Sequence, residues 1–172
     1  MIRNRLVPFL IAAVIFALDR WTKGAIKAHW SAYDTTTVIP GLFNIVHTEN
    51  PGIAFGMLAN TPGPWRDVLL IGFSVVVLVA ISFMLLRPAT ARDAVLRTAL
   101  VFILGGALGN LYDRIVNGTV TDFIEVHSGP HYFPAFNVAD SGVSVGACLL
   151  LLDMWRTKER SVSHASEANL NR

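Results

Sequence analysis

The stretch Val68-Leu-Leu-Ile-Gly-Phe-Ser-Val-Val-Val-Leu-Val-Ala-Ile-Ser-Phe-Met-Leu-Leu86 contains no charged residue. About 20 mostly apolar residues are enough for a helix to cross the hydrocarbon core of a bilayer. The whole 172-residue chain agrees, because it is 53% hydrophobic and only 15% charged. A soluble domain usually carries about 25% charged residues. The chain is therefore predicted to be an integral membrane protein.

Three further segments meet the same length criterion, at residues 6–26, 94–112 and 138–155. The predicted fold class is an α-helical integral membrane protein with four transmembrane helices. The first span resembles a secretory signal peptide, but Asp19-Arg-Trp21 stands where a signal peptidase requires small residues. We expect this span to be retained as a signal anchor.

The distribution of Lys and Arg predicts the orientation, because these residues accumulate in cytoplasmic segments. One side of the four spans holds nine of the 14 Lys and Arg residues, the connector at 87–93 and both termini. These nine are Arg3, Arg5, Arg87, Arg92, Arg97, Arg156, Lys158, Arg160 and Arg172. We therefore expect both termini in the cytoplasm and two external loops, at about residues 27–67 and 113–137.

The external loops contain strand-like patterns. Residues 35–46 are rich in β-branched and aromatic residues around a Pro-Gly turn, and residues 119–126 alternate like a strand. A small extracytoplasmic β-sheet is therefore predicted beside the helices. Residues 1–160 are predicted to form a single domain, and the polar segment 161–172 a disordered cytoplasmic tail.

Glycines in two of the spans predict close helix packing. Gly105 and Gly109 in the third span, and Gly142 and Gly146 in the fourth, are small-xxx-small pairs that let helix backbones approach closely in lipid. Such packing would bring Asp140 towards the end of the third span.

Two groups of polar residues allow both a structural and a functional interpretation. Asp19, Lys23 and Lys27 share one helical face, either as an ion pair with snorkelling lysines or as the lining of a cavity. At the end of the third span, Gly106, Asn110, Asp113 and Arg114 share another face. They could join helices and cap the span, or Arg114 could bind a carboxylate. Asn50, in the first external loop, is either a turn residue or a donor to a substrate backbone.

Several other chemistries find little support. His47, His127 and His131 could form a loop-borne zinc site, but Ser128-Gly-Pro130 separates the last two and excludes a helical H-E-x-x-H motif. No glycine-rich phosphate loop is present. The net charge of +2 is too small to indicate nucleic-acid binding.

Asp122 and Asp140 are predicted to lie just outside spans, on the external side. Each could be a polar residue at a span end, and Asp140 in particular suits helix capping. If the two met, one proton would be shared, because like charges at close range cannot both ionise cheaply. The ionised carboxylate could then activate water while the neutral one donates to a scissile carbonyl.

The motifs that carry these residues resemble those of the bacterial lipoprotein signal peptidases, the signal peptidase II family of aspartic membrane proteases. The resemblance covers about residues 8–156. Its motifs, in order, are Asp19-Arg-Trp-Thr-Lys23, Asn50-Pro-Gly-Ile-Ala-Phe-Gly56, Gly109-Asn-Leu-Tyr-Asp-Arg114, Gly118-Thr-Val-Thr-Asp-Phe-Ile124 and Phe136-Asn-Val-Ala-Asp140.

By this resemblance Asp122 and Asp140 correspond to the catalytic pair. The positions that shape or support the family's site are matched by Asp19, Lys23, Asn50, Gly106, Asn110, Asp113, Arg114 and Asn137. The resemblance implies an endopeptidase of the bacterial cytoplasmic (inner) membrane that cleaves N-terminal to a diacylglyceryl-modified cysteine. It implies no metal or cofactor, prolipoprotein substrates, contact with membrane lipids, and inhibition by the cyclic peptide globomycin.

A proton-coupled transporter or channel is the main alternative. Its relay would distribute carboxylates through the depth of the membrane. Here Asp113, Asp122 and Asp140 are predicted to gather at one face, with Asp19 nearby. This clustering favours an enzyme site.

Overall fold

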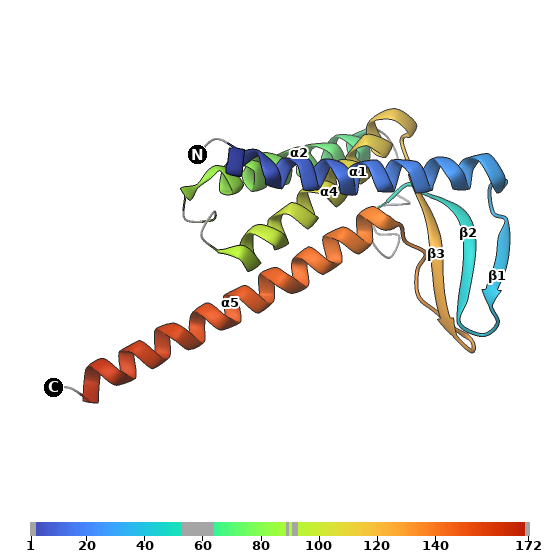
Figure 1. Cartoon of the computed structure of the whole chain (residues 1–172). Coiled ribbons are helices and arrows are strands. Elements are labelled where there is room, and N and C mark those ends of the chain that lie inside the picture. The colour runs from blue at the N-terminus through green and yellow to red at the C-terminus, as the bar shows by residue number, and fades with distance from the viewer. Residues whose placement is uncertain (1–2, 53–63, 89, 91–92, 171–172) are drawn as a thin grey trace.

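A computed structural model of the chain describes residues 3–52, 64–88, 90 and 93–170. Within these residues, long helices pack together and a small sheet lies at one end of them (Figure 1). The long helices are α1 (Arg3–His29), α2 (Trp65–Leu86), α4 (Ala94–Asn117) and α5 (Val138–Leu170). The strands are β1 (Thr35–Ile39), β2 (Phe43–Asn50), β3 (Val120–Ser128) and β4 (His131–Tyr132).

Three of the four predicted spans are confirmed as helices that are long and apolar enough to cross a membrane. They are Trp65–Leu86, Ala94–Asn117 and Val138–Lys158. Helix α1 is not among them in the described part of the chain, since it carries Asp19, Arg20 and Lys23. It nevertheless packs along α4. That α1 also crosses the membrane stays a prediction.

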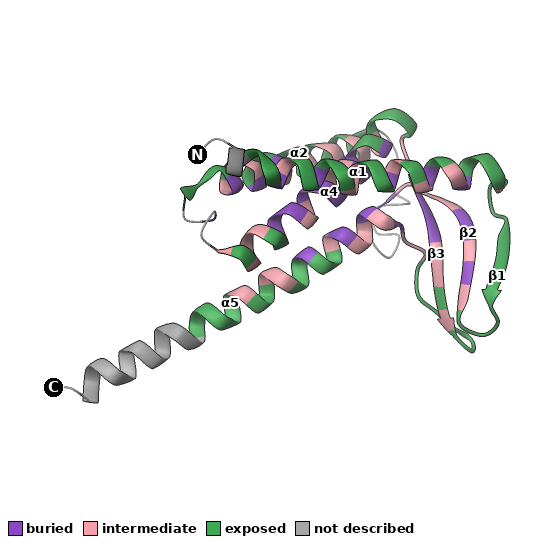
Figure 2. Cartoon of the chain, viewed as in Figure 1, coloured by how far each residue is buried: buried purple, intermediate pink, exposed green. Residues whose placement is uncertain are grey.

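The outward surfaces of the helices are apolar. Leu10, Phe73 and Leu151 are each more than 60% exposed, and exposed residues run along the outer sides of the helices (Figure 2). Soluble proteins rarely expose such an extended apolar surface to water. The pattern therefore fits helices whose outer faces contact lipid.

Helix α4 is the centre of the bundle, because it packs against α1, α2 and α5. Close approach depends on its glycines. A Cβ at Gly106 would collide with the Ala139 carbonyl of α5, and one at Gly105 would collide with Ile15 of α1. On the α5 side, Gly146 lies against the Ala99 carbonyl of α4. The predicted close packing is confirmed, although the glycines of α4 serve two neighbours instead of one.

The predicted sheet is also confirmed, with strand order β1-β2-β3-β4 and antiparallel pairing throughout. Helix α4 is capped by Gly118, whose φ of +74° suits a glycine just after a helix C-terminus, and β3 begins two residues later. Phe136 forms an isolated bridge with Ile124 of β3. This bridge holds the start of α5 beside β3.

The end of α5 differs from expectation. The helix continues to Leu170, whereas the sequence predicted a disordered tail from Ser161. The segment from Trp155 to Leu170 contains neither Pro nor Gly, so nothing in its backbone chemistry interrupts a helix that has already begun. Its C-terminal half diverges from the other helices (Figure 1).

Candidate functional site

Asp122 of β3 and Asp140 of α5 share one hydrogen-bonding partner, Asn137. The Asn137 Nδ2 donates to Asp122 Oδ1 at 2.7 Å, and its Oδ1 accepts from the Asp140 backbone N–H at 2.9 Å. Both aspartates line the same pocket. Two carboxylates 18 positions apart in sequence are therefore brought to one site.

The local sequence Asn137-Val-Ala-Asp140 explains how α5 begins at this point. Asn137 accepts from the Asp140 N–H, and the Asn137 N–H donates back to Asp140 Oδ2 at 3.3 Å. This reciprocal pair is a capping box, which satisfies N–H groups that a helix leaves free in its first turn. The predicted capping role of Asp140 is confirmed, and it coexists with a place in the pocket wall.

Two further amides complete the contacts of the pair. Asn110 Nδ2 donates to Asp140 Oδ1 at 2.7 Å, and Asn50 Nδ2 donates to Asp122 Oδ2 at 3.0 Å. Asn50 Oδ1 also accepts from the Gly52 N–H at 2.9 Å, so Asn50 does form a turn. Residues 53–56 of the motif that begins at Asn50 lie outside the described residues.

The environment of Asp122 favours its protonated form. Its side chain is almost fully buried, and no Lys or Arg among the described residues forms an ion pair with it. Burial and then the negative charge of Asp140 raise the pKa of Asp122 to about 7, although hydrogen bonds from Asn50 and Asn137 oppose this shift. A carboxyl group with this pKa can exchange a proton near neutral pH.

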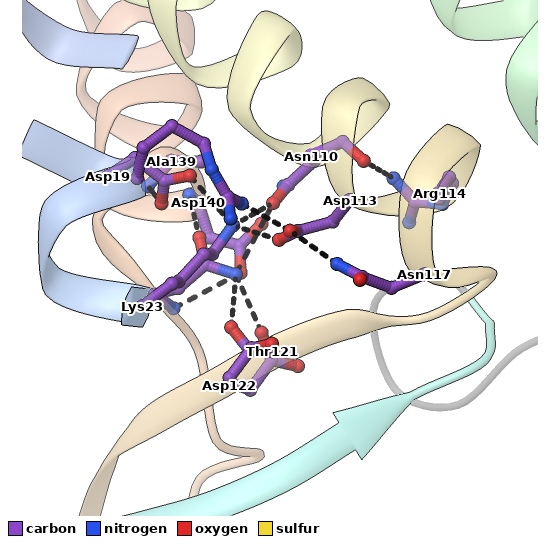
Figure 3. A network of polar contacts seen from close by, with 12 residues as sticks. Asp19, Lys23, Asn110, Asp113, Arg114, Asn117, Thr121, Asp122, Ala139 and Asp140 are labelled. Carbon is purple, nitrogen blue, oxygen red and sulfur yellow. Dashed lines mark hydrogen bonds and ion pairs between the residues drawn. The ribbon is translucent and has the colours of Figure 1, made fainter. Parts of the chain in front are cut away.

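A second set of charges lies beside the pair, between α1 and α4. We call Asp19, Arg20, Lys23 and Asp113 the buried cluster (Figure 3 draws Asp19, Lys23 and Asp113). Lys23 Nζ lies 2.8 Å from Asp19 Oδ2 and 2.8 Å from Asp113 Oδ2, and Arg20 pairs with the other oxygen of Asp113. Asp19, Lys23 and Asp113 are fully buried. Two positive and two negative charges leave the cluster neutral.

The buried cluster contacts the aspartate pair through its neighbours. Lys23 Nζ donates to Asn110 Oδ1 at 3.0 Å, and Asp19 Oδ1 accepts from the Ala139 N–H in the first turn of α5 at 2.9 Å. Asp19 and Lys23 therefore join helices and do not line the pocket. Lys27, predicted on the same face, instead contacts Glu49 at 3.4 Å.

The pocket itself has a volume of about 800 Å³ and a lining of mixed polarity. Its polar lining residues are Thr48, Asn50, Asn110, Arg114, Asp122, Glu125, Asp140, Ser141 and Ser144. Its apolar lining residues are Val120, Phe133, Pro134, Ala135, Phe136, Val143 and Val145. Such a cavity suits an amphipathic ligand whose polar group faces the carboxylates.

Arg114 and Gly106 have different roles at this pocket. Arg114 Nη2 donates to the Gly52 carbonyl at 3.0 Å, so it holds the chain just after β2 near the carboxylates. It is not bound bidentately to either aspartate. Gly106 contributes the close contact between α4 and α5.

Sequence reasoning missed two contacts. Arg20 is the second cation of the buried cluster, and a network around Glu49 lies next to Asp122 in the sheet. Both pair residues that are distant in sequence, so spacing carried no signal for them.

Two of the histidines considered as zinc ligands make other contacts. His47 contacts Trp30 and Glu49, and His127 stacks on Tyr132. Over the described ranges, no three His, Cys, Asp or Glu side chains are placed to hold a metal ion.

Comparisons with known proteins agree with this architecture. Two solved structures, described as bacterial membrane enzymes studied by the in meso method at 2.3 Å and 1.9 Å resolution, are each 28% identical to the chain. Their TM-scores are 0.80 and 0.76, and they cover 90% and 86% of this chain and 90% and 92% of their own. The fold and the site thus define a membrane-embedded enzyme.

Sequence comparisons identify the family. Lipoprotein signal peptidases of Solibacter usitatus and of Pseudomonas aeruginosa strain UCBPP-PA14 are 43% and 44% identical to the chain. Each alignment covers 89% of this chain, and 93% and 90% of the respective relative. The family model described as signal peptidase (SPase) II matches residues 11–156, and the chain belongs to this family. It is therefore a membrane peptidase.

Proposed function

We propose that this chain is an aspartic endopeptidase that removes the signal peptide from prolipoproteins. It would hydrolyse the bond N-terminal to a diacylglyceryl-modified cysteine at the external membrane interface. The observation that carries the proposal is the pair Asp122 and Asp140, joined through Asn137 at the wall of an amphipathic pocket. Membership of the signal peptidase II family supports it.

In the proposed mechanism the two aspartates have different protonation states. Asp140 lies in the first turn of α5, where the helix dipole favours a negative charge, so it acts as the base. The pKa of Asp122, raised to about 7 by burial and by the charge of Asp140, lets it carry the shared proton and act as the acid.

The chemical step then needs only water. Asp140 takes a proton from the water, and the water oxygen attacks the scissile carbonyl carbon. At the same time Asp122 donates its proton to the carbonyl oxygen. The tetrahedral intermediate collapses, the C–N bond breaks, and the proton held by Asp140 passes to the cysteine nitrogen. Asp122 recovers its proton from the former carbonyl oxygen, so the pair returns to its starting state.

The pocket supports substrates of this class. The diacylglyceryl chains would lie against the apolar lining residues, which include Val143 and Val145 of α5. The peptide would lie near the polar lining residues Arg114 and Asn50. Positioning the bond beside two carboxylates away from bulk water supplies much of the catalytic effect in such sites.

The proposal includes the location and the ligands that the family resemblance implies. The chain would reside in the bacterial inner membrane with both termini in the cytoplasm, and globomycin-type inhibitors would occupy the same pocket. Prolipoproteins and membrane lipids would be its partners.

The test is cleavage of a diacylglyceryl-modified precursor by the purified full chain in detergent with a strong chelator. Asp122→Asn and Asp140→Asn should each lower the rate by about 10²–10⁴-fold, the usual contribution of acid–base groups. Asp67→Asn, which alters a partly exposed carboxylate at the start of α2, should retain the wild-type rate. Near-normal cleavage by either site variant would overturn the proposal, as would loss of wild-type activity with the chelator.

A further inference from the structure

The face of the sheet opposite Asp122 carries a second polar network, centred on Glu49. Successive side chains of a strand point to opposite faces, so Asn50 and Glu49 diverge, as do Asp122 and Thr121. Glu49 Oε1 accepts from the Thr121 hydroxyl at 3.1 Å, and Oε2 accepts from the Thr119 hydroxyl at 2.6 Å. The Glu49 side chain of β2 thus binds two hydroxyls, that of Thr121 on β3 and that of Thr119 just before β3.

Lys27 of α1 and His47 of β2 face the same carboxylate. Lys27 Nζ of α1 lies 3.4 Å from Glu49 Oε1, and His47 Nε2 of β2 lies 3.1 Å from it. His47 Nδ1 lies 2.9 Å from the Trp30 carbonyl oxygen. That oxygen and an ionised Glu49 can only accept, so the ring satisfies both when each of its nitrogens carries a proton.

Glu49 itself is held in its ionised form. Burial raises its pKa, but the hydrogen bonds from Thr119 and His47, the charge of Lys27 and the hydrogen bond from Thr121 outweigh burial and leave the pKa below its usual value. The network therefore depends on the negative charge of Glu49, because all four surrounding groups donate to it or are positive.

The position of this network in the sheet gives it a consequence for the site. The β2–β3 pairing has an irregularity between Ile45 and Thr48, so regular alternation does not set the register beyond it. The three pairs after it are Thr48 with Asp122, Glu49 with Thr121 and Asn50 with Val120. The contacts of Glu49 therefore lie within the short paired stretch that places Thr48 and Asn50 near Asp122.

We propose that Glu49 is a positioning residue for the reaction, which fixes β2 on β3 so that the Asn50 amide donates to Asp122. The inference rests on the proposed function, since it concerns the same aspartate pair. Glu49 does not touch the pocket and acts through Asn50 and Thr121. Its effect therefore lies in the placement and protonation of Asp122.

The decisive variant is Glu49→Gln, which keeps the shape of the side chain and removes its charge. We expect kcat to fall about 10–100-fold with KM changed less than about twofold, because a small misplacement of a reacting group lowers the rate. The hydrogen bond from Asn50 lowers the pKa of Asp122. Its loss should therefore move the alkaline limb of the kcat–pH profile to higher pH, as Asn50→Ala also should.

A matched pair of variants tests the same contact if Glu49→Gln does not fold. Thr121→Val removes the hydroxyl at nearly constant volume, whereas Thr121→Ser keeps it. We expect Thr121→Val to reproduce the lower kcat and the shifted limb, and Thr121→Ser to restore both. A purely structural role would reduce the amount of folded protein and leave the limb in place, which would overturn the proposal.

Asp122→Asn in the same preparations separates the two proposals. If Asp122→Asn is inactive and Glu49→Gln matches the wild type in kcat and pH profile, the positioning role of Glu49 alone is wrong. If Asp122→Asn cleaves normally, the proposed mechanism fails and the role of Glu49 fails with it.

Discussion

The buried cluster and the aspartate pair lie side by side, and both keep carboxylates away from water. In the buried cluster each carboxylate faces a cation: Asp19 faces Lys23, and Asp113 faces Lys23 and Arg20. In the pair, by contrast, Asp122 and Asp140 are bound by amides of three asparagines and by a backbone N–H.

In the proposed mechanism, this difference separates structural from chemical use of the same residue type. A carboxylate paired with a buried cation joins helices, at a large cost if one partner is lost. A carboxylate bound by neutral amides, next to another carboxylate, can gain or lose a proton near neutral pH. The partners of a buried aspartate, more than its burial, therefore indicate what it does.

The largest expected effect is on stability, from breaking the buried cluster. Lys23→Met should lower the free energy of unfolding by about 3–5 kcal/mol, because it leaves Asp19 and Asp113 buried with Arg20 as their remaining cation. Denaturant titration of the purified protein in detergent measures this loss. The double variant Lys23→Met with Asp19→Asn should be less destabilised. Wild-type stability of Lys23→Met would contradict a structural role for the cluster.

The next effect is on rate, from removing the amide shared by the pair. Asn137→Ala should lower kcat about 100-fold by freeing Asp122 and Asp140 from their common partner. Loss of the helix cap should cost only about 1 kcal/mol of stability. Asn117→Ala is the matched control, since Asn117 donates to Asp113 of the buried cluster. Equal kinetics for the two variants would remove the distinction between the two regions.

The smallest expected effect is a gain in the free energy of unfolding for Asp122→Asn, opposite in sign to the loss expected for Lys23→Met. Because the pKa of Asp122 rises from 3.8 to about 7 on folding, the folded chain keeps a proton between these pH values that the unfolded chain loses. Wild-type stability therefore falls as the pH rises from about 4 to 7. Asp122→Asn avoids this loss, so at pH 8 it should be at least about 1 kcal/mol more stable than wild type.

Denaturant titration of Asp122→Asn and of the wild type at several pH values checks the sign of this stability difference. The gain over wild type should vanish below about pH 3, where the wild-type carboxyl group, with its unfolded pKa of 3.8, is protonated in both states. A gain that stays constant with pH would contradict the assigned protonation of Asp122.

Much of the fold follows from local sequence. The uncharged run Val68–Leu86 is helical from Trp65, and residue 94 starts α4 because Asp93 accepts from the Val95 and Leu96 N–H groups. Strand patterns at 35–46 and 119–126 likewise predicted β1–β3. These features depend on neighbours in sequence, so they can be derived from it.

The assembled site is less accessible to such reasoning. Asp122 and Asp140 were expected to meet, but nothing in their spacing indicated that Asn137 would bind both. Arg20 and Glu49 acquire their roles from partners more than 60 positions away. Their side chains, taken singly, are ordinary interfacial residues, and only tertiary contacts distinguish them.

The hydrogen bond from Ala139 to Asp19 joins residues 120 positions apart. Helix α1 thereby supplies an acceptor for a backbone N–H in the first turn of α5. During synthesis Asp19 leaves the ribosome long before Ala139, so a nascent chain holds half of a helix cap and no reactive centre. In the proposed mechanism the enzyme would become competent only after α5 had formed, and chains terminated before α5 would be inert.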